Sequence, residues 1–358
     1  MGILNLLTNR IKIIQGLSKY QKTEEPKPIF AHLLLTNRCN LDCRYCFVDV
    51  NTIHKSDLLL EEWKKIISEL HERGCVSITL MGGEPLLFPG LYDLTTHAKS
   101  LGLNVDLITN GIGIEKHIAT VLKIDSVMVS LDGEKEGNDI NRGKRSFDYA
   151  HKAIKLLKEK NIPVRINCVV TRQNKNSIPW LLKYAKENMT PVTFNLPSDF
   201  PNDARGLEKE IMLNDEEVRA FYSSLLEYKK KDKKIRSLIL ASEEVIDQTL
   251  KYPVPYNEVI WRTPNDQMDA KNTCLFGQIW VHINSNGDIY PCSQLWNIPD
   301  KFQPKNVKID GFDSALENTR NLKCKSCFCL APAEWRRTMT PKGMLKGARV
   351  TIAQSLGI

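Results

Sequence analysis

The chain has 358 residues, of which 42% are hydrophobic and 26% are charged, and its mean hydropathy is -0.31. This composition suits a globular protein with one large core and a smaller domain. We find no run of 18 apolar residues and no signal-peptide pattern, so we expect a cytoplasmic protein that is neither membrane-spanning nor secreted. Ten cysteines in a reducing compartment indicate metal binding or catalysis more than disulfides.

The net charge of +8 is partly local, because the run KKKDKK from Lys229 to Lys234 holds much of the excess. A solvated helix face explains such a run better than nucleic-acid binding does. We therefore expect no nucleic-acid partner.

The first segment, residues 1–20, is close to a basic amphipathic helix. Its apolar residues stand at positions 3, 4, 6, 7, 11, 13, 14 and 17, among Arg10, Lys12 and Lys19. Such a helix could rest on a membrane surface or pack across the main domain, and we expect packing. N-myristoylation is not expected, because Leu6 stands where that signal needs Ser or Thr.

From Phe30 onward, short apolar runs alternate with amphipathic stretches, which predicts six strand–helix units. The expected strands are residues 30–36, 76–81, 104–109, 126–131, 164–171 and 192–196. The expected helices lie near residues 57–73, 90–101, 114–122, 146–160 and 176–189. This order predicts a parallel sheet, either doubly wound or barrel-like, whose site lies in the loops after the strand C-termini.

Three cysteines, Cys39, Cys43 and Cys46, follow the first expected strand directly. A structural zinc site closes its shell with four protein ligands, so this loop is one thiolate short. A cubane iron–sulfur cluster tolerates three, because a small molecule can bind the fourth iron. A zinc site completed by a distant cysteine remains the alternative.

Other unusual residues follow the next strands and should share the same edge. In MGGEP (81–85), paired glycines allow close backbone approach and Glu84 could accept hydrogen bonds from an amine. TNG (109–111) follows the third strand, and a long polar loop (130–143) with Ser130, Asp132 and Arg142 follows the fourth. Arg142 could bind a carboxylate through its two-pronged guanidinium. The alternatives are an ordinary glycine turn and an exposed ion pair.

The pattern CNLDCRYC (39–46), with aromatic Tyr45 before its third cysteine, resembles the CxxxCxxC motif of radical S-adenosylmethionine enzymes. MGGEP resembles the GGE segment of the same family. The resemblance implies an α/β fold, a partial (β/α)6 TIM-like barrel over roughly residues 28–200. It also implies that Cys39, Cys43 and Cys46 hold a [4Fe-4S] cluster, with S-adenosylmethionine as the ligand of its fourth iron.

Further site residues follow from this resemblance. Gly82, Gly83 and Glu84 would receive the methionine amino group. Ser130 and Arg142 would approach its carboxylate or the ribose, and Asn167 is a further ribose candidate. Tyr45 or Phe47 would lie near the adenine. The implied reaction is reductive cleavage of S-adenosylmethionine to a 5′-deoxyadenosyl radical, which abstracts a hydrogen atom from an unactivated C–H bond.

The C-terminal part contains a second set of cysteines. In residues 273–292, the polar turn NSNG separates two strand-like runs and predicts a hairpin that brings Cys274 towards Cys292. Cys324 and Cys327 follow as a CxxC pair. Cys329 is left over, either as a buried thiol, as a substitute ligand or as a hydrogen-atom donor to a substrate radical, and we expect the buried thiol. The pattern resembles the short form, called twitch, of the auxiliary-cluster SPASM domain. That resemblance implies a second [4Fe-4S] cluster on the four cysteines, with a zinc knuckle as the alternative.

Two cysteines stand apart from both sets, because Cys75 and Cys168 lie beside apolar strand runs and are expected in the core.

The expected domains are an N-terminal leader (1–27), the barrel (28–200), a linking helical segment (201–272), the twitch domain (273–335) and a tail (336–358). Helices are expected near 215–231 and 237–250. In the linking segment, Trp261, Arg262 and Asp266 are candidates for substrate contact, although a surface loop explains them equally well.

Three classes of function remain open. The first expectation is a radical enzyme acting on a small molecule, namely a carbohydrate, a cyclitol or a lipid-linked substrate. The alternative is a maturase that modifies a peptide or protein, as in sulfatase or ribosomal-peptide maturation. The third is a non-catalytic iron–sulfur or zinc-binding module. For either enzyme we expect an electron donor such as flavodoxin or ferredoxin.

Overall fold

The computed structural model describes residues 11–20, 27–48, 57–197, 208–252, 255–256, 274–296, 302–321 and 328–338. The chain divides into two compact units. The first comprises Met1–Ser130, Arg142–Val164 and Phe276–Leu322, and the second comprises Leu131–Asn141, Arg165–Leu275 and Lys323–Ile358.

Four parallel strands form the central sheet of the first unit. They are β1 (Phe30–Leu34), β2 (Ser77–Met81), β3 (Asn104–Thr109) and β4 (Ser126–Ser130). One row across the sheet, from β1 to β4, consists of Leu33, Leu80, Leu107 and Val127, each fully buried. In β3 (NVDLIT), buried residues alternate with half-buried ones, which is the period of two that a strand with one fully buried face shows.

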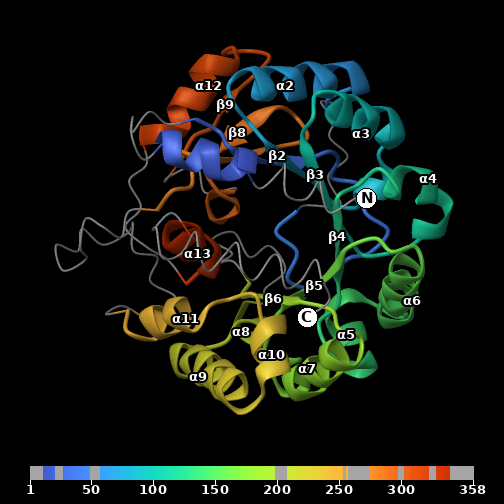
Figure 1. The fold of residues 1–358 in the computed structure, drawn as a ribbon, viewed down its shortest axis with the longest axis vertical. Helices are drawn as coiled ribbons and strands as arrows, with labels where there is room; N and C mark the ends of the chain where they lie inside the picture. Colours follow the sequence, from blue (N-terminus) through green and yellow to red (C-terminus); the bar gives the residue numbers. More distant parts are fainter. Residues whose placement is uncertain are drawn as a thin grey trace. The chain divides into compact units, whose positions relative to one another are not determined.

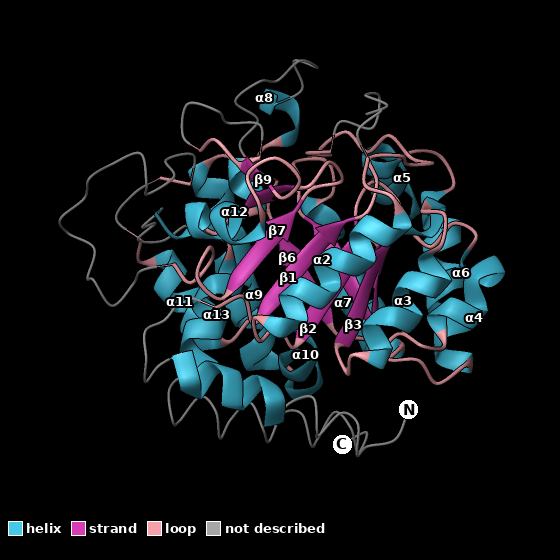
Figure 2. Cartoon of the chain, turned by 90° about the horizontal axis from the view of Figure 1, so that it is seen from above, coloured by secondary structure: helices cyan, strands magenta, loops and turns pink. Residues whose placement is uncertain are grey.

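Helices follow each of these strands, and Figure 2 shows α2 and α3 lying over β1, β2 and β3. The helices of this unit are α2 (Leu60–Glu72), α3 (Leu91–Ser100), α4 (Ile118–Val121), α6 (Ser146–Glu159) and α12 (Phe312–Asn318). Short 3-10 turns stand at Pro85–Leu87, Ile114–His117, Ser293–Leu295 and Thr319–Asn321. Helix α2 buries Trp63, Ile66 and Leu70, the apolar stripe that its sequence predicts.

The predicted C-terminal hairpin is present, and it joins the same sheet. Strands β7 (Trp280–Ile283) and β8 (Asp288–Tyr290) are antiparallel, and Gly287 in the connecting turn has φ of 94°. Strand β7 also pairs in parallel with β1, and β9 (Lys305–Asn306) pairs with β8. The parallel pairing with β1 joins residues about 250 positions apart, so local sequence patterns gave no sign of it.

Helix α12 lies beside α2, as Figure 1 shows, although the two are far apart in the sequence. Arg73, at the end of α2, is ion-paired with Asp313 at 2.7 Å, and its guanidinium carbon lies 4.7 Å from the centre of the Phe312 ring. Lys308 pairs with Glu62 at 2.8 Å. These contacts hold the C-terminal part of the first unit against its N-terminal part.

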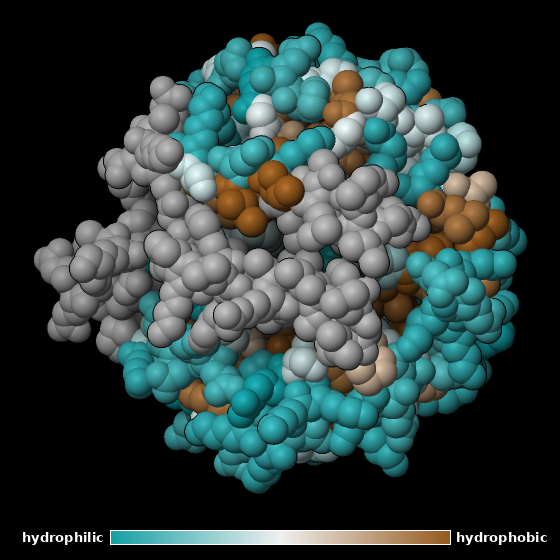
Figure 3. All heavy atoms as spheres, viewed as in Figure 1, coloured by the Kyte–Doolittle hydropathy of each residue, from teal (hydrophilic) through white to brown (hydrophobic). Residues whose placement is uncertain are grey.

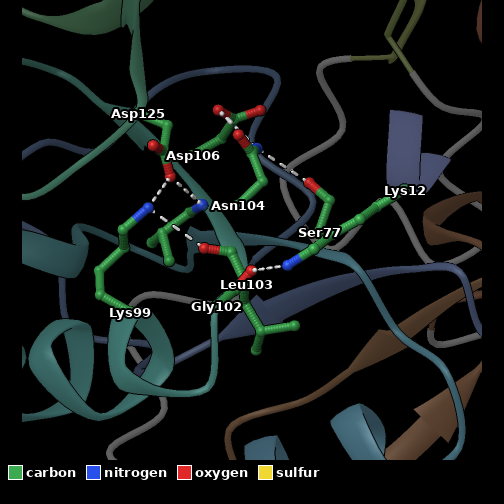
Figure 4. A network of polar contacts seen from close by, with 9 residues as sticks. Lys12, Ser77, Lys99, Gly102, Leu103, Asn104, Asp106 and Asp125 are labelled. Carbon is green, nitrogen blue, oxygen red and sulfur yellow. Dashed lines mark hydrogen bonds and ion pairs between the residues drawn. The ribbon is translucent and has the colours of Figure 1, made fainter. Parts of the chain in front are cut away.

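A network of polar side chains connects the N-terminal ends of strands β2, β3 and β4 (Figure 4). Buried Asp125 accepts hydrogen bonds from Lys99 Nζ at 2.5 Å and from the Val105 backbone N–H at 2.7 Å. Asn104 Nδ2 donates to Ser77 Oγ at 3.1 Å. A buried carboxylate paired and hydrogen-bonded in this way anchors the end of α3 to β3.

The second unit contains the parallel pair β5 (Val164–Val169) and β6 (Val192–Asn195). Its helices are α5 (Lys135–Arg142), α7 (Ile178–Glu187), α8 (Glu208–Ile211), α9 (Asp215–Lys231), α10 (Lys233–Leu238), α11 (Glu243–Leu250) and α13 (Leu330–Thr338), with a 3-10 turn at Lys175–Ser177. Along the chain, strands β1 to β6 alternate with helices as predicted. The predicted α/β class and the partial (β/α)6 barrel with a C-terminal hairpin are therefore confirmed.

Three local predictions were wrong. The loop expected at 130–143 contains helix α5, although Gly137 and Asn138 are poor helix formers. The single helix expected at 237–250 is two helices, because Asp232 caps α10 and Ser242 caps α11. The KKKDKK run is not one solvated face, since Lys229 is buried and donates to the carbonyls of Arg236 and Ile239.

Residues 11–20 are helical and pack within the first unit, as expected. Leu17 is buried, and Lys12 Nζ donates to the Gly102 carbonyl at 3.2 Å. In the described ranges, every helix is too short or too polar to cross a bilayer. On the face shown in Figure 3, hydrophilic residues cover most of the described surface. Contact of the leader with a membrane surface stays a prediction.

Candidate functional site

The loop after β1 carries Cys39, Cys43 and Cys46, all of them partly exposed. The Leu41 backbone N–H donates to Cys39 Sγ at 3.4 Å, and the Cys46 N–H donates to the Cys43 carbonyl at 3.0 Å. Burial is the main cause that raises the pKa of Cys39 to about 11, and the negative charges of the nearby Glu84 and Cys43 add to it. A positively charged group beside this thiol would therefore favour its thiolate.

Within the described ranges, no group of three or more His, Cys, Asp or Glu side chains could hold a single metal ion. A zinc ion needs all its ligands within about 2.3 Å of one centre, whereas each thiolate of a cubane binds its own iron. Three separate, accessible thiols on one short loop fit the cubane that the family resemblance implies.

Gly82 and Gly83 lie directly against the backbone of the cysteine loop. The Gly83 N–H donates to the Thr36 carbonyl at 2.7 Å, and the Glu84 N–H donates to the Arg38 carbonyl at 2.8 Å. A Cβ on Gly83 would stand 2.3 Å from the Arg38 carbonyl oxygen, and one on Gly82 would stand 2.6 Å from that of Thr36. Only glycine allows this approach, so the pair fixes the loop whatever it binds.

Glu84 is buried and fully engaged by donors from its own segment and from β3. Its carboxylate accepts hydrogen bonds from the Leu86 N–H at 3.1 Å, Thr109 Oγ1 at 2.8 Å and the Asn110 N–H at 2.8 Å. Burial raises the pKa of Glu84 to about 7, against the opposing effect of these three hydrogen bonds. The Glu84 side chain therefore connects the segment that follows β2 to the end of β3 through hydrogen bonds.

Asn110 is a site residue that sequence reasoning did not select. Its side-chain Nδ2 lies 2.8 Å from Asn40 Oδ1 and 3.9 Å from Cys39 Sγ. The only signal in the sequence was the position of TNG (109–111) at the end of a strand, on the same edge as the cysteines. That tripeptide reads equally well as an ordinary turn.

Two further predicted residues come together in the first unit. Arg142 is buried, and its guanidinium carbon lies 5.4 Å from the centre of the Tyr45 ring, which is also buried. Cation–π contact of this kind holds an arginine in place beside an aromatic face. Ser130 ends β4 and is buried. Phe47 instead contacts Trp296 of the C-terminal region, with ring centres 6.0 Å apart.

In the second unit, Asn167 lies on β5 and accepts a hydrogen bond from Asn195 Nδ2 at 2.6 Å. Asp132 is fully buried, and its carboxylate accepts from the Val169 N–H at 2.9 Å. These contacts give both residues a role in the local structure of this unit. The role of Asn167 toward a ribose remains a prediction.

The second cysteine set is only partly described. Cys274 belongs to the second unit and Cys292 to the first, where it follows β8, and both are partly exposed. Cys324 and Cys327 lie outside the described residues, as do Trp261, Arg262 and Asp266. Cys329 is partly exposed, whereas a buried thiol was expected.

The two isolated cysteines are in the core, as predicted. Cys75 and Cys168 are both buried, and their S–H groups donate to the carbonyls of Ser77 and Asp132. Burial raises the pKa of Cys75 to about 12, which keeps it protonated and inert.

Comparison with known proteins finds a family model that matches part of the chain. Residues 33–185 match the family model described as the radical SAM superfamily. The Fe-coproporphyrin III synthase of Methanosarcina barkeri is 32% identical over 185 residues, which are 50% of this chain and 46% of that protein. The sporulation killing factor maturation protein SkfB of Bacillus subtilis is 34% identical over 155 residues, 42% of this chain and 38% of that protein.

A third relative, the PqqA peptide cyclase of Streptomyces rochei, is 33% identical over 145 residues, 39% of this chain and 40% of that protein. The chain therefore aligns with less than half the length of each of these curated relatives. Among solved structures, Streptococcus suis SuiB bound to S-adenosylmethionine has a TM-score of 0.65 at 20% identity, covering 89% of this chain and 74% of that chain. This likeness shows the fold.

Proposed function

Because residues 33–185 of this chain match the model of the radical SAM superfamily, we propose that the chain is a radical S-adenosylmethionine enzyme that modifies a peptide. Cys39, Cys43 and Cys46 would hold its [4Fe-4S] cluster. The bound cluster and S-adenosylmethionine supply reductive cleavage of the cosubstrate and removal of a hydrogen atom from the substrate. The protein's own residues bind, orient and shield these partners.

The roles of those residues follow from their contacts. The backbone of Gly82 and Gly83 supports the cysteine loop, and the role of this segment toward the amino group of S-adenosylmethionine stays a prediction. Arg142, already held over Tyr45 at 5.4 Å, offers a fork for the carboxylate. Tyr45 in turn provides a flat apolar surface near the adenine, and Ser130 a hydroxyl at the end of β4.

Peptide modification is supported by the names of two relatives, a maturation protein and a peptide cyclase, at 34% and 33% identity. They favour the maturase alternative over the small-molecule substrate that was our first expectation. Such an enzyme would also hold an auxiliary [4Fe-4S] cluster on Cys274, Cys292, Cys324 and Cys327. Of these, Cys292 follows strand β8 and is partly exposed.

A small-molecule substrate remains the second candidate, because the Fe-coproporphyrin III synthase relative aligns over 185 residues, more than either peptide enzyme does. The electron donor, a flavodoxin or ferredoxin, and a cytoplasmic location belong to the proposal for either substrate.

The test measures 5′-deoxyadenosine formed by the anaerobically reconstituted chain with dithionite and S-adenosylmethionine. It is run alone, with a defined library of synthetic peptides, and with an iron porphyrin that such a synthase could convert to iron coproporphyrin III. We expect peptides to raise the rate above the substrate-free level and to appear as products of altered mass. Stimulation by the porphyrin alone would favour the second candidate and overturn the peptide proposal.

A further inference from the structure

The side-chain amide of Asn110 is held from two directions. Its Oδ1 accepts a hydrogen bond from the Ile112 backbone N–H at 2.9 Å. Because that partner can only donate, the acceptor must be the oxygen, and this fixes which end of the amide is nitrogen. The Asn110 backbone N–H also donates to Glu84 Oε2 at 2.8 Å, and Asn110 is buried. The amide is therefore locked in one orientation.

The nitrogen end of this amide points at the cysteine loop. Nδ2 lies 2.8 Å from Asn40 Oδ1 and 3.9 Å from Cys39 Sγ. An amide NH2 has two hydrogens, so one can bind the Asn40 oxygen while the other faces the sulfur. The Leu41 backbone N–H donates to the same sulfur at 3.4 Å. Cys39 thus receives one donor from its own loop and one from the end of β3.

We propose that Asn110 is a positioning residue that orients Cys39 and raises the reduction potential of the [4Fe-4S] cluster through an N–H···S hydrogen bond. This inference rests on the proposed function, since it needs Cys39 as a cluster ligand. Reduction adds negative charge to the cluster and its sulfurs, and a donor to a ligand sulfur stabilises that charge. Removing the donor therefore makes the cluster harder to reduce.

Two substitutions separate the donor from the local structure. Asn110→Asp keeps the shape of the side chain and the oxygen that accepts a hydrogen bond from the Ile112 N–H. It replaces the NH2 group with an oxygen that cannot donate. Asn110→Ala removes both groups without adding a charge. Asn104→Ala is the matched control, because Asn104 is an asparagine at the other end of β3 and its Nδ2 donates to Ser77 Oγ at 3.1 Å.

The measurement is an EPR-monitored redox titration of the reconstituted full chain, together with its iron content. The relevant signal is the one that a Cys39/Cys43/Cys46→Ala variant lacks. We expect both Asn110 variants to keep their iron but to show an about tenfold lower ratio of reduced to oxidised cluster at a fixed potential. For a one-electron couple this is a shift of about 59 mV to more negative values. Asn104→Ala should titrate as the wild type does.

Several outcomes would overturn the inference. One is a wild-type potential in both Asn110 variants with full iron, and another is a shift in Asn110→Ala without one in Asn110→Asp. Loss of iron from both variants, with Asn104→Ala intact, would make Asn110 a residue of loop structure only. If instead the Cys39/Cys43/Cys46→Ala variant keeps all signals of the wild type, the proposed function itself fails, which is a separate result.

Discussion

The cysteine loop and the Gly82–Glu84 segment follow neighbouring strands, but they are built in opposite ways. The three thiols of the loop are partly exposed and accessible to a ligand. The glycine segment has no free space, since a Cβ on Gly83 would stand 2.3 Å from the Arg38 carbonyl, and Glu84 is buried with three donors. The difference indicates that one segment is a rigid support and the other presents the ligands.

The largest effect should come from filling the contact between the two segments. Gly83→Ala forces the Arg38 carbonyl to move, and overpacking of this kind costs about 1–3 kcal/mol. We expect a lower midpoint of thermal unfolding and much reduced iron uptake, because the loop backbone that holds the three cysteines is displaced. Both can be measured on the chain before and after anaerobic reconstitution.

A glycine elsewhere in the first unit serves as the control. The nearest atoms to a Cβ on Gly16 belong to the Ile29 side chain at 3.5 Å, an ordinary contact. Gly16→Ala, inside the helix of residues 11–20, should leave iron uptake unchanged and add about 0.5–1 kcal/mol of stability. Equal iron uptake by Gly83→Ala and Gly16→Ala would contradict the claim that the glycine segment supports the cysteine loop.

A loss of stability of the same order is expected for the buried carboxylate of the support. Glu84→Gln turns one acceptor oxygen into an NH2 that faces a donor, which costs about 1–3 kcal/mol for the unsatisfied group. The unfolding free energy of the cluster-free chain measures it. Glu115→Gln is the matched control, because the Glu115 side chain is exposed and its ion pair with Lys152 at 3.4 Å is worth at most about 1 kcal/mol. Similar losses in both variants would contradict the role given to Glu84.

Much of the fold and of the candidate site was predictable from local sequence. The apolar strand runs located β1 to β6, and the spacing of Cys39, Cys43 and Cys46 identified their loop. The pairing of β7 with β1 was not predictable, since it is non-local. Helix α5 was missed because its propensity is poor, whereas Gly137 fits there by lying close to Ser177, where a Cβ would stand 2.8 Å from the hydroxyl oxygen. Asn110 was missed because TNG gives no sign of the partners it meets in the fold.

A separate effect, on the pH dependence of stability, is expected from two histidines on strands β1 and β7. His32 on β1 and His282 on β7 pair in register, with ring centres 4.6 Å apart. Among the residues that the structure describes, neither ring nitrogen of His282 has a hydrogen-bond partner. Burial lowers the pKa of His32 to about 3, and it also lowers that of His282. Below the ordinary value of 6.5, the unfolded chain therefore binds protons that the folded chain does not.

The contribution of the histidine pair to stability should accordingly fall as the pH is lowered from 6.5 towards 3. The unfolding free energy of the cluster-free chain, followed over this range, gives the slope. In His282→Leu the slope should be shallower, and the stability at neutral pH should not decrease, because an unsatisfied buried imidazole is removed. An unchanged slope in this variant would show that the pair does not titrate on unfolding.

The most direct test of the account is 5′-deoxyadenosine formation from S-adenosylmethionine under reduction, compared between the reconstituted wild type and the Cys39/Cys43/Cys46→Ala variant. We predict that the wild type forms 5′-deoxyadenosine and that the variant forms none, while the variant keeps any iron bound at the second cysteine set. Equal formation by both chains, or none by a wild type with full iron content, would contradict the assignment of the cysteine loop as the radical centre.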